Sequence, residues 1–243
     1  MNDIAIIILA AGKGTRMKSQ KAKVLHELNG HPMLSYVIKT SQKITKNCVI
    51  VVGHQADEVQ KAAKKYSKDV KFAFQNEQLG TGHAVLCALP CIDQKVKDVI
   101  ILCGDVPLIK SETLTKIIDM HNKNKNMVSL IAMKLEDPTG YGRLFYNDEK
   151  RLKRIIEEAD ATEKQRKIKI VNSGTYIVNR KFLLDSVSNL EDKNAQKEFY
   201  LTDIIEKAYL KKINSGFIIA DNPNELSGVN DIKQLKRLEK VME

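Results

Sequence analysis

The feature that most restricts the fold is an almost unbroken apolar run over residues 4–10, close to the start of the chain. A strand that is apolar on both sides must be covered on both faces, which is typical of a parallel sheet packed between helices. The run leads directly into the turn Gly12-Lys13-Gly14. The chain therefore opens with a buried strand that ends in a glycine-rich, basic loop.

Strand-like and helix-like segments alternate through the first half of the chain, as in successive β-α-β units. We expect strands at residues 4–10, 48–53, 70–74, 99–103 and 127–133, with helices at 32–43, 56–66, 82–89 and after Ser111 as N-cap. This order predicts a doubly wound α/β fold with a mostly parallel sheet. Ligands bind beyond the carboxyl ends of the strands in such folds. The loops after residues 10 and 103 are therefore the first places to search for a site.

The second half is less regular and contains more short strands. After a turn-rich loop at 138–143, we expect strands at 143–146, 152–157, 171–178 and 217–220, and a charged stretch at 160–169. Thr202 is expected to cap a helix that reaches about residue 212. A C-terminal helix over 230–242 has an apolar face of Ile232, Leu235, Leu238 and Val241 or Met242. We interpret residues 1–243 as one domain with an inserted β-rich portion.

Composition limits the kind of protein. No run approaches the roughly 20 apolar residues that a membrane span needs, and the opening run lacks the flanks of a signal peptide. We therefore expect a cytoplasmic protein without membrane partners. The four cysteines, of which none form a CxxC pair, are expected to be free thiols rather than zinc ligands: Cys48, Cys87, Cys91 and Cys103.

The net charge of +10 allows for a nucleic-acid ligand. However, the lysines are dispersed, and the chain has no aromatic-rich RNA-binding strand and no zinc-finger pattern. A small anionic substrate fits the charge equally well. We therefore expect no nucleic-acid partner.

The loop after the first strand has the chemistry of a phosphate site. Its glycines let backbone N–H groups approach phosphate oxygens, and Lys13 and Arg16 add positive charge. Lys23 follows closely enough to reach the same phosphates. Two better-known motifs are excluded, because Met17 replaces the third glycine of GxGxxG and no GxxxxGK[ST] string occurs.

Two further loops carry candidate site residues. The polar stretch at 75–83 includes Gln75, whose amide offers a donor and an acceptor suited to a base edge. Gly80 permits close approach, and Thr81 is either a helix cap or a ligand contact. After the strand that ends at 103, Gly104-Asp105 places a carboxylate at the edge of the sheet. A carboxylate there is suited to Mg²⁺, which prefers hard oxygen ligands.

Five strings occur together in one order, and the ordered set is far more specific than any one string. The chain thereby resembles the uridyltransferase domain of bacterial N-acetylglucosamine-1-phosphate uridyltransferases, over essentially its whole length. Residues 157–161, 171–174, 200–205 and 228–231 fit the same family. The strings are Leu9-Ala-Ala-Gly-Lys-Gly-Thr-Arg-Met17, Lys23-Val-Leu25, Glu77-Gln-Leu-Gly-Thr-Gly-His-Ala84, Gly104-Asp-Val-Pro-Leu-Ile109 and Asp137-Pro-Thr-Gly-Tyr-Gly-Arg143.

The resemblance implies a role for each matching residue. Arg16, Lys23 and Asp105 would be catalytic, and Mg²⁺ would be the cofactor, held by Asp105 and Asn230. The nucleotide would contact Leu9, Ala10, Ala11, Gly12, Lys13, Gln75, Gly80, Thr81, Cys103 and Gly104. The N-acetylglucosamine phosphate would contact Gly140, Glu157, Asn172, Tyr200, Thr202 and Asn230.

The implied reaction joins UTP to N-acetylglucosamine-1-phosphate and releases pyrophosphate. Relatives usually add a C-terminal left-handed β-helix with acetyltransferase activity, and this chain shows no hexapeptide repeats, so that second activity is not expected. Two alternatives remain open: a related transferase with another sugar or base, and a non-catalytic nucleotide- or nucleic-acid-binding protein. The sequence does not indicate the oligomeric state.

Overall fold

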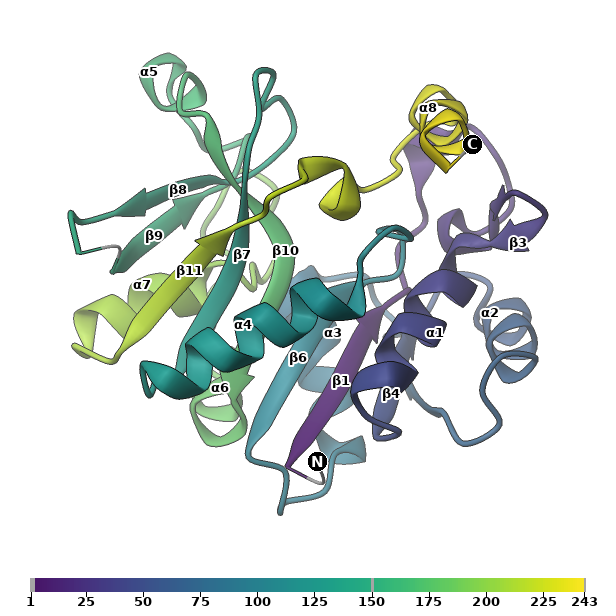
Figure 1. The fold of residues 1–243 in the computed structure, drawn as a ribbon, viewed down its shortest axis with the longest axis horizontal. Coiled ribbons are helices and arrows are strands. Elements are labelled where there is room, and N and C mark those ends of the chain that lie inside the picture. The colour runs from purple at the N-terminus through teal and green to yellow at the C-terminus, as the bar shows by residue number, and fades with distance from the viewer. Residues whose placement is uncertain (1–2, 150, 243) are drawn as a thin grey trace.

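A mixed sheet of nine strands forms the centre of the computed structural model, which describes residues 3–149 and 151–242 (Figure 1). β1 pairs in parallel with β4 and β6, and β4 with β5, whereas β10 runs antiparallel to β6 and β7. The expected doubly wound, mostly parallel α/β fold is confirmed. The main path runs β11 (Ser215–Ile219), β7 (Val128–Lys134), β10 (Ile170–Asn179), β6 (Asp98–Cys103), β1 (Ile4–Leu9), β4 (Cys48–Val52), β5 (Lys71–Phe74).

Helices cover both faces of the sheet (Figure 1). α1 (Met33–Ile44), α2 (Ala56–Lys64) and α4 (Ser111–Lys123) pack on one face, and α3 (Thr81–Ala88), α6 (Arg180–Val187) and α7 (Asp203–Leu210) on the other. Because side chains alternate along a strand, Ile6 and Ile8 of β1 enter the first core, while Ala5 and Ile7 enter the second. The apolar run at the start of the chain is therefore needed by both layers.

The β-rich portion is a hairpin of β8 (Arg143–Tyr146) and β9 (Leu152–Ile156). It joins the main sheet through the pairing of Val171 on β10 with Arg143. The short helix α5 (Glu163–Arg166) lies within the charged stretch after β9. Four 3-10 turns complete this inventory: η1 (Thr15–Met17), η2 (Lys23–Leu25), η3 (Leu89–Cys91) and η4 (Pro223–Leu226).

The last helix, α8 (Ile232–Met242), packs beside residues 28–33 rather than on the β-rich portion (Figure 1). Leu235 and Leu238 form a small cluster with Leu28 and Met33. Leu28 lies in β2 (Glu27–Leu28), which pairs with β3 (His31–Pro32). Met33 is the first residue of α1. Val241 or Met242 was expected on the same apolar face, but the structure does not describe these two side chains. No helix in the described part of the chain is long and apolar enough to cross a membrane.

Three expected helix starts differ from the structure. Lys110 holds the N-cap position of α4, and Ser111 is its first helical residue, with a hydroxyl that bonds to Glu112. Thr202 precedes α7 but makes no cap bond, because its hydroxyl donates to a carboxylate of the site described below. α8 begins at Ile232 instead of residue 230, since the side chain of Asp231 accepts the backbone N–H of Gln234 at 2.8 Å.

α6 was not expected. Its N-cap signal is present, because the side chain of Asn179 accepts the N–H of Phe182 at 3.2 Å. The helix follows β10 without an intervening turn, so the apolar pattern of the strand runs into that of the helix. Periodicity alone did not separate them.

Ile101 lies in β6, at the centre of the sheet, and is fully buried. We expect Ile101→Ala to lower the free energy of unfolding by about 3 kcal/mol, because the lost methyl groups leave a cavity between packed layers. Urea denaturation monitored by circular dichroism measures the change. The control is Ile219→Ala on the edge strand β11, whose side chain is 43% exposed and whose loss should cost less than about 1 kcal/mol. Equal effects of the two substitutions would contradict this account of the core.

Candidate active site

The loops after β1 and β6 open at the same place because these strands are neighbours in parallel register. Leu9 at the end of β1 pairs with Cys103 at the end of β6. The backbone N–H of Gly104 then donates to the carbonyl of Leu9 at 2.9 Å. The glycine-rich loop and Asp105 are thereby placed together at the carboxyl edge of the sheet, as expected for this class of fold.

A cavity of about 270 Å³ lies at this edge. Most of the residues assigned to the nucleotide from the sequence line it, and Val24, Gln78, Ala84 and Glu198 line it as well. Val24, Gln78 and Ala84 lie within the strings quoted above but were given no role of their own, whereas Glu198 lies outside those strings. The assigned residues in the wall are Leu9, Ala10, Ala11, Gly12, Lys23, Gln75, Gly80, Thr81, Cys103 and Asp105.

Three other assigned residues do not line the cavity. Lys13 and Arg16 are exposed on the loop and form no hydrogen bond or ion pair with any described residue. Gly104 lies behind the wall, where an added Cβ would stand 3.1 Å from both the Leu9 carbonyl oxygen and a Val24 methyl group. Gly104 thus contributes to the close packing of the strand ends, while the two cations remain available to an incoming anion.

Lys23 connects three distant parts of the chain. Its ammonium forms an ion pair with Asp105 and donates to the side-chain oxygen of Asn230 at 3.2 Å. The position of Lys23 is fixed by close contact with the opening loop, since a Cβ on Gly14 would stand 2.6 Å from the Cβ of Lys23. Asn230 is held beside this pair because the N–H of Val229 donates to the carbonyl of Asp105 at 3.0 Å.

The same contact tests whether a divalent cation fits. The oxygens of Asp105 and Asn230 converge on one positive group, the Lys23 ammonium, and carboxylate and amide oxygens are the ligand types that Mg²⁺ prefers. Among the described residues, no three His, Cys, Asp or Glu side chains form a metal-binding group. The donor set fits a magnesium ion that takes its remaining ligands from phosphates and water.

The polar stretch after β5 folds around Gln75, which is 4% exposed. Its amide nitrogen donates to the carbonyl of Gly80 at 2.9 Å. Gly80 has φ +109°, and a Cβ there would stand 2.7 Å from the Phe199 carbonyl oxygen, so only glycine suits this position. Thr81 does not cap α3; its hydroxyl oxygen accepts the N–H of Leu201 at 3.1 Å.

The residues assigned to the sugar lie where β9, β10 and α7 meet. The Thr202 hydroxyl donates to Glu157 at 3.0 Å. Burial raises the pKa of Glu157, and the Thr202 bond opposes that rise. The neighbouring Tyr176 hydroxyl is buried without a hydrogen-bond partner among the described residues, and burial, then the charge of Glu157, raise its pKa. Glu157 is therefore a half-buried acceptor rather than a solvated strand end.

Asn172 and Tyr200 have partners within the protein. The side-chain oxygen of Asn172 accepts the N–H of Gly174 at 3.0 Å, and the Tyr200 hydroxyl donates to Gln196 at 2.9 Å. Tyr200 is 7% exposed, and burial raises the pKa of its hydroxyl well above the usual range. The segment 198–202 contacts both groups of residues, since Glu198 lines the cavity beyond β1 and β6 while Thr202 bonds to Glu157.

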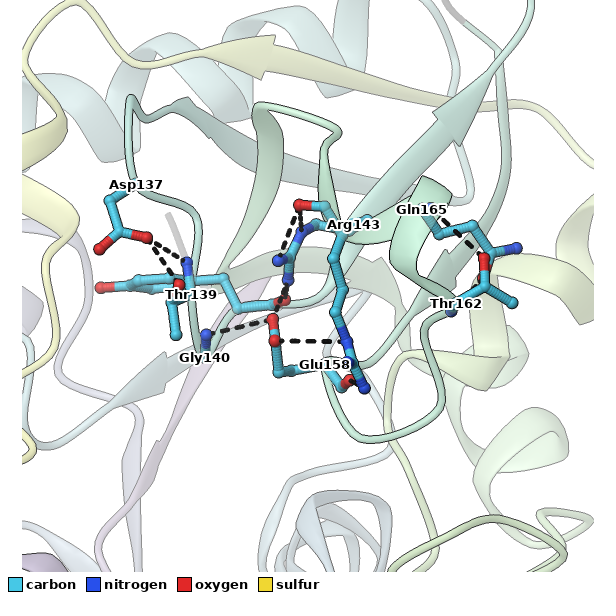
Figure 2. A network of polar contacts seen from close by, with 9 residues as sticks. Asp137, Thr139, Gly140, Arg143, Glu158, Thr162 and Gln165 are labelled. Atoms are coloured by element: carbon cyan, nitrogen blue, oxygen red, sulfur yellow. Dashed lines mark hydrogen bonds and ion pairs between the residues drawn. The ribbon is translucent and has the colours of Figure 1, made fainter.

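Gly140 is held by a polar network that the sequence did not reveal (Figure 2). Its N–H donates to Glu158 at 3.2 Å, and the guanidinium of Arg143, 1% exposed, lies 2.5 Å from the same carboxylate. Arg143 also donates to the carbonyls of Tyr141 and Arg166. Because a buried guanidinium needs such partners, Arg143 fixes the 137–143 loop relative to the end of β9.

Comparisons with known proteins agree on the family. A model of the nucleotidyl transferase family matches residues 5–223. A bifunctional protein GlmU from Geotalea uraniireducens is 47% identical over 237 residues, which are 97% of this chain and 51% of that protein. A bifunctional protein GlmU from Streptococcus uberis is 42% identical over 237 residues, with the same two shares. The chain thus spans about half the length of these curated relatives.

A solved structure supports the fold. HddC from Yersinia pseudotuberculosis, complexed with GMP-PN, superposes with a TM-score of 0.71. The match covers 98% of this chain and 99% of that one at 20% sequence identity. At this identity the likeness extends to the fold alone.

Asp203, the first residue of α7, gives a pH-dependent prediction. Burial, followed by repulsion from Glu206, raises its pKa to about 6 from the ordinary 3.8 of an aspartate. An acid whose pKa is raised on folding favours the folded state below its unfolded pKa, and that contribution is lost as the pH rises through the folded pKa. We expect Asp203→Asn to increase the free energy of unfolding by about 0.5–1 kcal/mol at pH 7.5, a figure reduced for solvent screening, and to make no difference near pH 4.

Chemical denaturation at several pH values measures this difference. The control is Asp185→Asn, because the hydrogen bond and charge of Lys211 lower the pKa of Asp185. We therefore expect Asp185→Asn to lower the free energy of unfolding at pH 7.5, the opposite of the change expected for Asp203→Asn. A gain for Asp185→Asn, or no pH dependence for Asp203→Asn, would contradict the two assignments.

Proposed function

Because the chain belongs to the nucleotidyl transferase family, we propose that it transfers the uridylyl group of UTP to N-acetylglucosamine-1-phosphate. The products are UDP-N-acetylglucosamine and pyrophosphate. The observation that carries the proposal is the pairing, in one cavity, of a base-reading edge with the Lys23–Asp105–Asn230 contact. One end of the cavity is suited to a base and the other to phosphates.

The base-reading edge consists of Gln75 and Gly80. The Gln75 amide uses its nitrogen within the protein, so its oxygen remains an acceptor. The N–H of Gly80 has no acceptor in the described part of the chain and is a donor in the cavity wall. An acceptor beside a donor matches N3–H and O4 of uracil. Cytosine presents an acceptor and a donor at these positions, so both contacts would be mismatched.

The sugar half of the proposal rests on the group around Glu157. A half-buried carboxylate beside Thr202 and near Asn172 offers acceptors and donors for sugar hydroxyls and an N-acetyl group. The Gly140 loop lies at the same end of β9. The segment 198–202 connects this group to the cavity, which supports adjacent positions for the two substrates.

The reaction needs no general base. A phosphate oxygen of the sugar-1-phosphate is already anionic, and it attacks the α-phosphorus of UTP as the bond to the β-phosphate oxygen breaks. The obstacle is the repulsion between two polyanions. Lys23 faces the cavity, and Lys13 and Arg16 stand exposed on the adjoining loop, so all three can offset negative charge on the phosphates. Backbone N–H groups of the loop add fixed dipoles.

Asp105 and Asn230 are the residues that would hold Mg²⁺. When bound, the ion would screen the phosphates and stabilise the charge that develops on the leaving group. Asp105 is half-buried, forms an ion pair with Lys23 and lines the cavity. Positioning of both substrates contributes much of the remaining rate enhancement.

The alternatives are less well supported. A related transferase for cytosine or a purine would need a different edge at Gln75 and Gly80, whereas thymine presents the same N3–H and O4 as uracil. A transferase for another sugar would need a different group at Glu157. A non-catalytic nucleotide- or nucleic-acid-binding protein would not need the contact of Lys23, Asp105 and Asn230. The relatives named GlmU favour the first proposal.

The proposal is tested by a substrate panel. UTP, TTP, CTP, ATP and GTP are each paired with N-acetylglucosamine-1-phosphate, glucosamine-1-phosphate and glucose-1-phosphate, and pyrophosphate release is measured with Mg²⁺ present. We expect UTP with N-acetylglucosamine-1-phosphate to have the highest kcat/KM, with CTP at least about 100-fold lower because both edge contacts are lost. Preference for another pair would replace the substrate assignment, and no release with any pair would refute the reaction.

The phosphate end of the cavity is tested by two substitutions. Asp105→Ala and Lys23→Ala should each lower kcat/KM by about 100-fold or more, because each removes charge that stabilises the transition state. The control is Asp119→Ala, which removes an exposed carboxylate on α4. Thermal melting checks that all three variants fold. Near-normal pyrophosphate release by folded Asp105→Ala would remove this carboxylate from the mechanism.

A further inference from the structure

The side chain of His83 contacts Gln75 from outside the cavity. Its Nδ1 lies 3.2 Å from the Gln75 amide nitrogen. His83 stands on α3 and does not belong to the cavity wall, whereas Gln75 does. Any effect of His83 on a bound base must therefore pass through Gln75.

The chemistry of the partners fixes which end of the Gln75 amide faces which way. A backbone carbonyl can only accept a hydrogen bond, so the group 2.9 Å from the Gly80 oxygen must be the amide nitrogen. That nitrogen carries two hydrogens, and the second is directed to His83 Nδ1. Both hydrogens are thus engaged, and the amide oxygen is left for the cavity.

The same chain of contacts fixes the tautomer of His83. Nδ1 must accept from the amide, so a neutral ring carries its hydrogen on Nε2. Nε2 lies 3.6 Å from the sulfur of Cys87, one turn along α3, and a sulfur atom is a weak acceptor. The donor and acceptor roles agree at each step from Cys87 through His83 to Gln75.

We propose that His83 is a positioning residue that sets base specificity by holding the Gln75 amide with its oxygen toward the base. This inference rests on the uridylyltransferase function proposed above. One hydrogen bond, to Gly80, leaves an amide able to swing about that single contact. The second bond, to His83, fixes the plane of the amide and keeps an acceptor opposite the position of uracil N3–H.

The experiment compares His83→Ala with His83→Asn. Alanine removes the acceptor, whereas the asparagine Oδ1 is separated from the backbone by the same number of bonds as His Nδ1 and can accept from Gln75. Steady-state kinetics are measured with UTP and with CTP, each against N-acetylglucosamine-1-phosphate. The matched control is Cys91→Ala, because the only hydrogen bond of the Cys91 thiol among the described residues is to the Phe72 carbonyl, away from Gln75.

We expect His83→Ala to raise the KM for UTP and to lower the UTP-to-CTP ratio of kcat/KM by about five- to tenfold, the effect of one hydrogen bond. The kcat at saturating UTP and the KM for the sugar phosphate should change less than about twofold. His83→Asn should restore most of the ratio, and Cys91→Ala should leave it unchanged. If His83 had only a general structural role, His83→Ala would change kcat/KM for UTP and for CTP equally, and asparagine would not restore it.

Failure of this inference can be told apart from failure of the proposed function. If the wild-type protein prefers UTP and folded His83→Ala keeps the same ratio, or if His83→Asn is as impaired as His83→Ala, His83 does not position Gln75. If the wild-type protein shows no preference for UTP over CTP, the base assignment itself is wrong. Calorimetry then measures the binding of UMP and CMP to the wild-type protein, His83→Ala and His83→Asn without turnover. The ratio of the two affinities can therefore be tested even if no turnover is measured.

Discussion

The contact of Lys23 with Asp105 and Asn230 is the interaction on which the arrangement of the site depends. It joins the first loop, the end of the central strand and the approach to the last helix, which lie 207 positions apart along the chain at their extremes. Each partner alone would be an ordinary surface group. Held together in a half-buried position, they create one point where positive charge and hard oxygen ligands meet beside the strand ends.

At the site, the two halves of the molecule are also joined by backbone hydrogen bonds, in addition to the cores that they share. Phe199 exchanges hydrogen bonds with both sides of the Gly80 turn, from its N–H to Leu79 and from Gly82 to its carbonyl. The missing side chain of Gly80 makes this approach close enough. The segment that leads to Thr202 and Glu157 is therefore positioned by the Gly80 loop, and under the proposed function the geometry of one substrate position would depend on the other.

Much of the fold and of the family could be predicted from the sequence, and the family resemblance is confirmed by the comparisons. The strand at residues 4–10 was predictable because burial on both faces requires an unbroken apolar run. The antiparallel direction of β10 was not, since its apolar pattern is the same in either direction. The roles of Arg143 and Glu158 were also hidden, because charged residues in a loop are normally solvated, and only the folded chain brings them together.

Helix caps were the least predictable local feature. Thr202 and Thr81 both have the residue type and position of a cap, yet each hydroxyl has a long-range partner. Residue type gives only the local option, and the folded structure decides between it and a distant one. Next to Asn230, the capping bond is made by Asp231, whose side chain accepts the N–H of Gln234. The Asn230 amide oxygen instead accepts a hydrogen bond from Lys23.

The interruption of β10 has a consequence for how variants there are interpreted. Pairing with β7 shifts between Asn172 and Tyr176, so the peptide groups between them lack strand partners. Side chains substitute for the missing ladder: Asn172 accepts from Gly174, and the Ser173 hydroxyl oxygen accepts from Thr175. The Asn172 amide therefore supports the backbone, and the proposed function would have the same amide contact the sugar. Loss of activity on its replacement would mix two deficits, and aspartate, which keeps the accepting oxygen, would separate them.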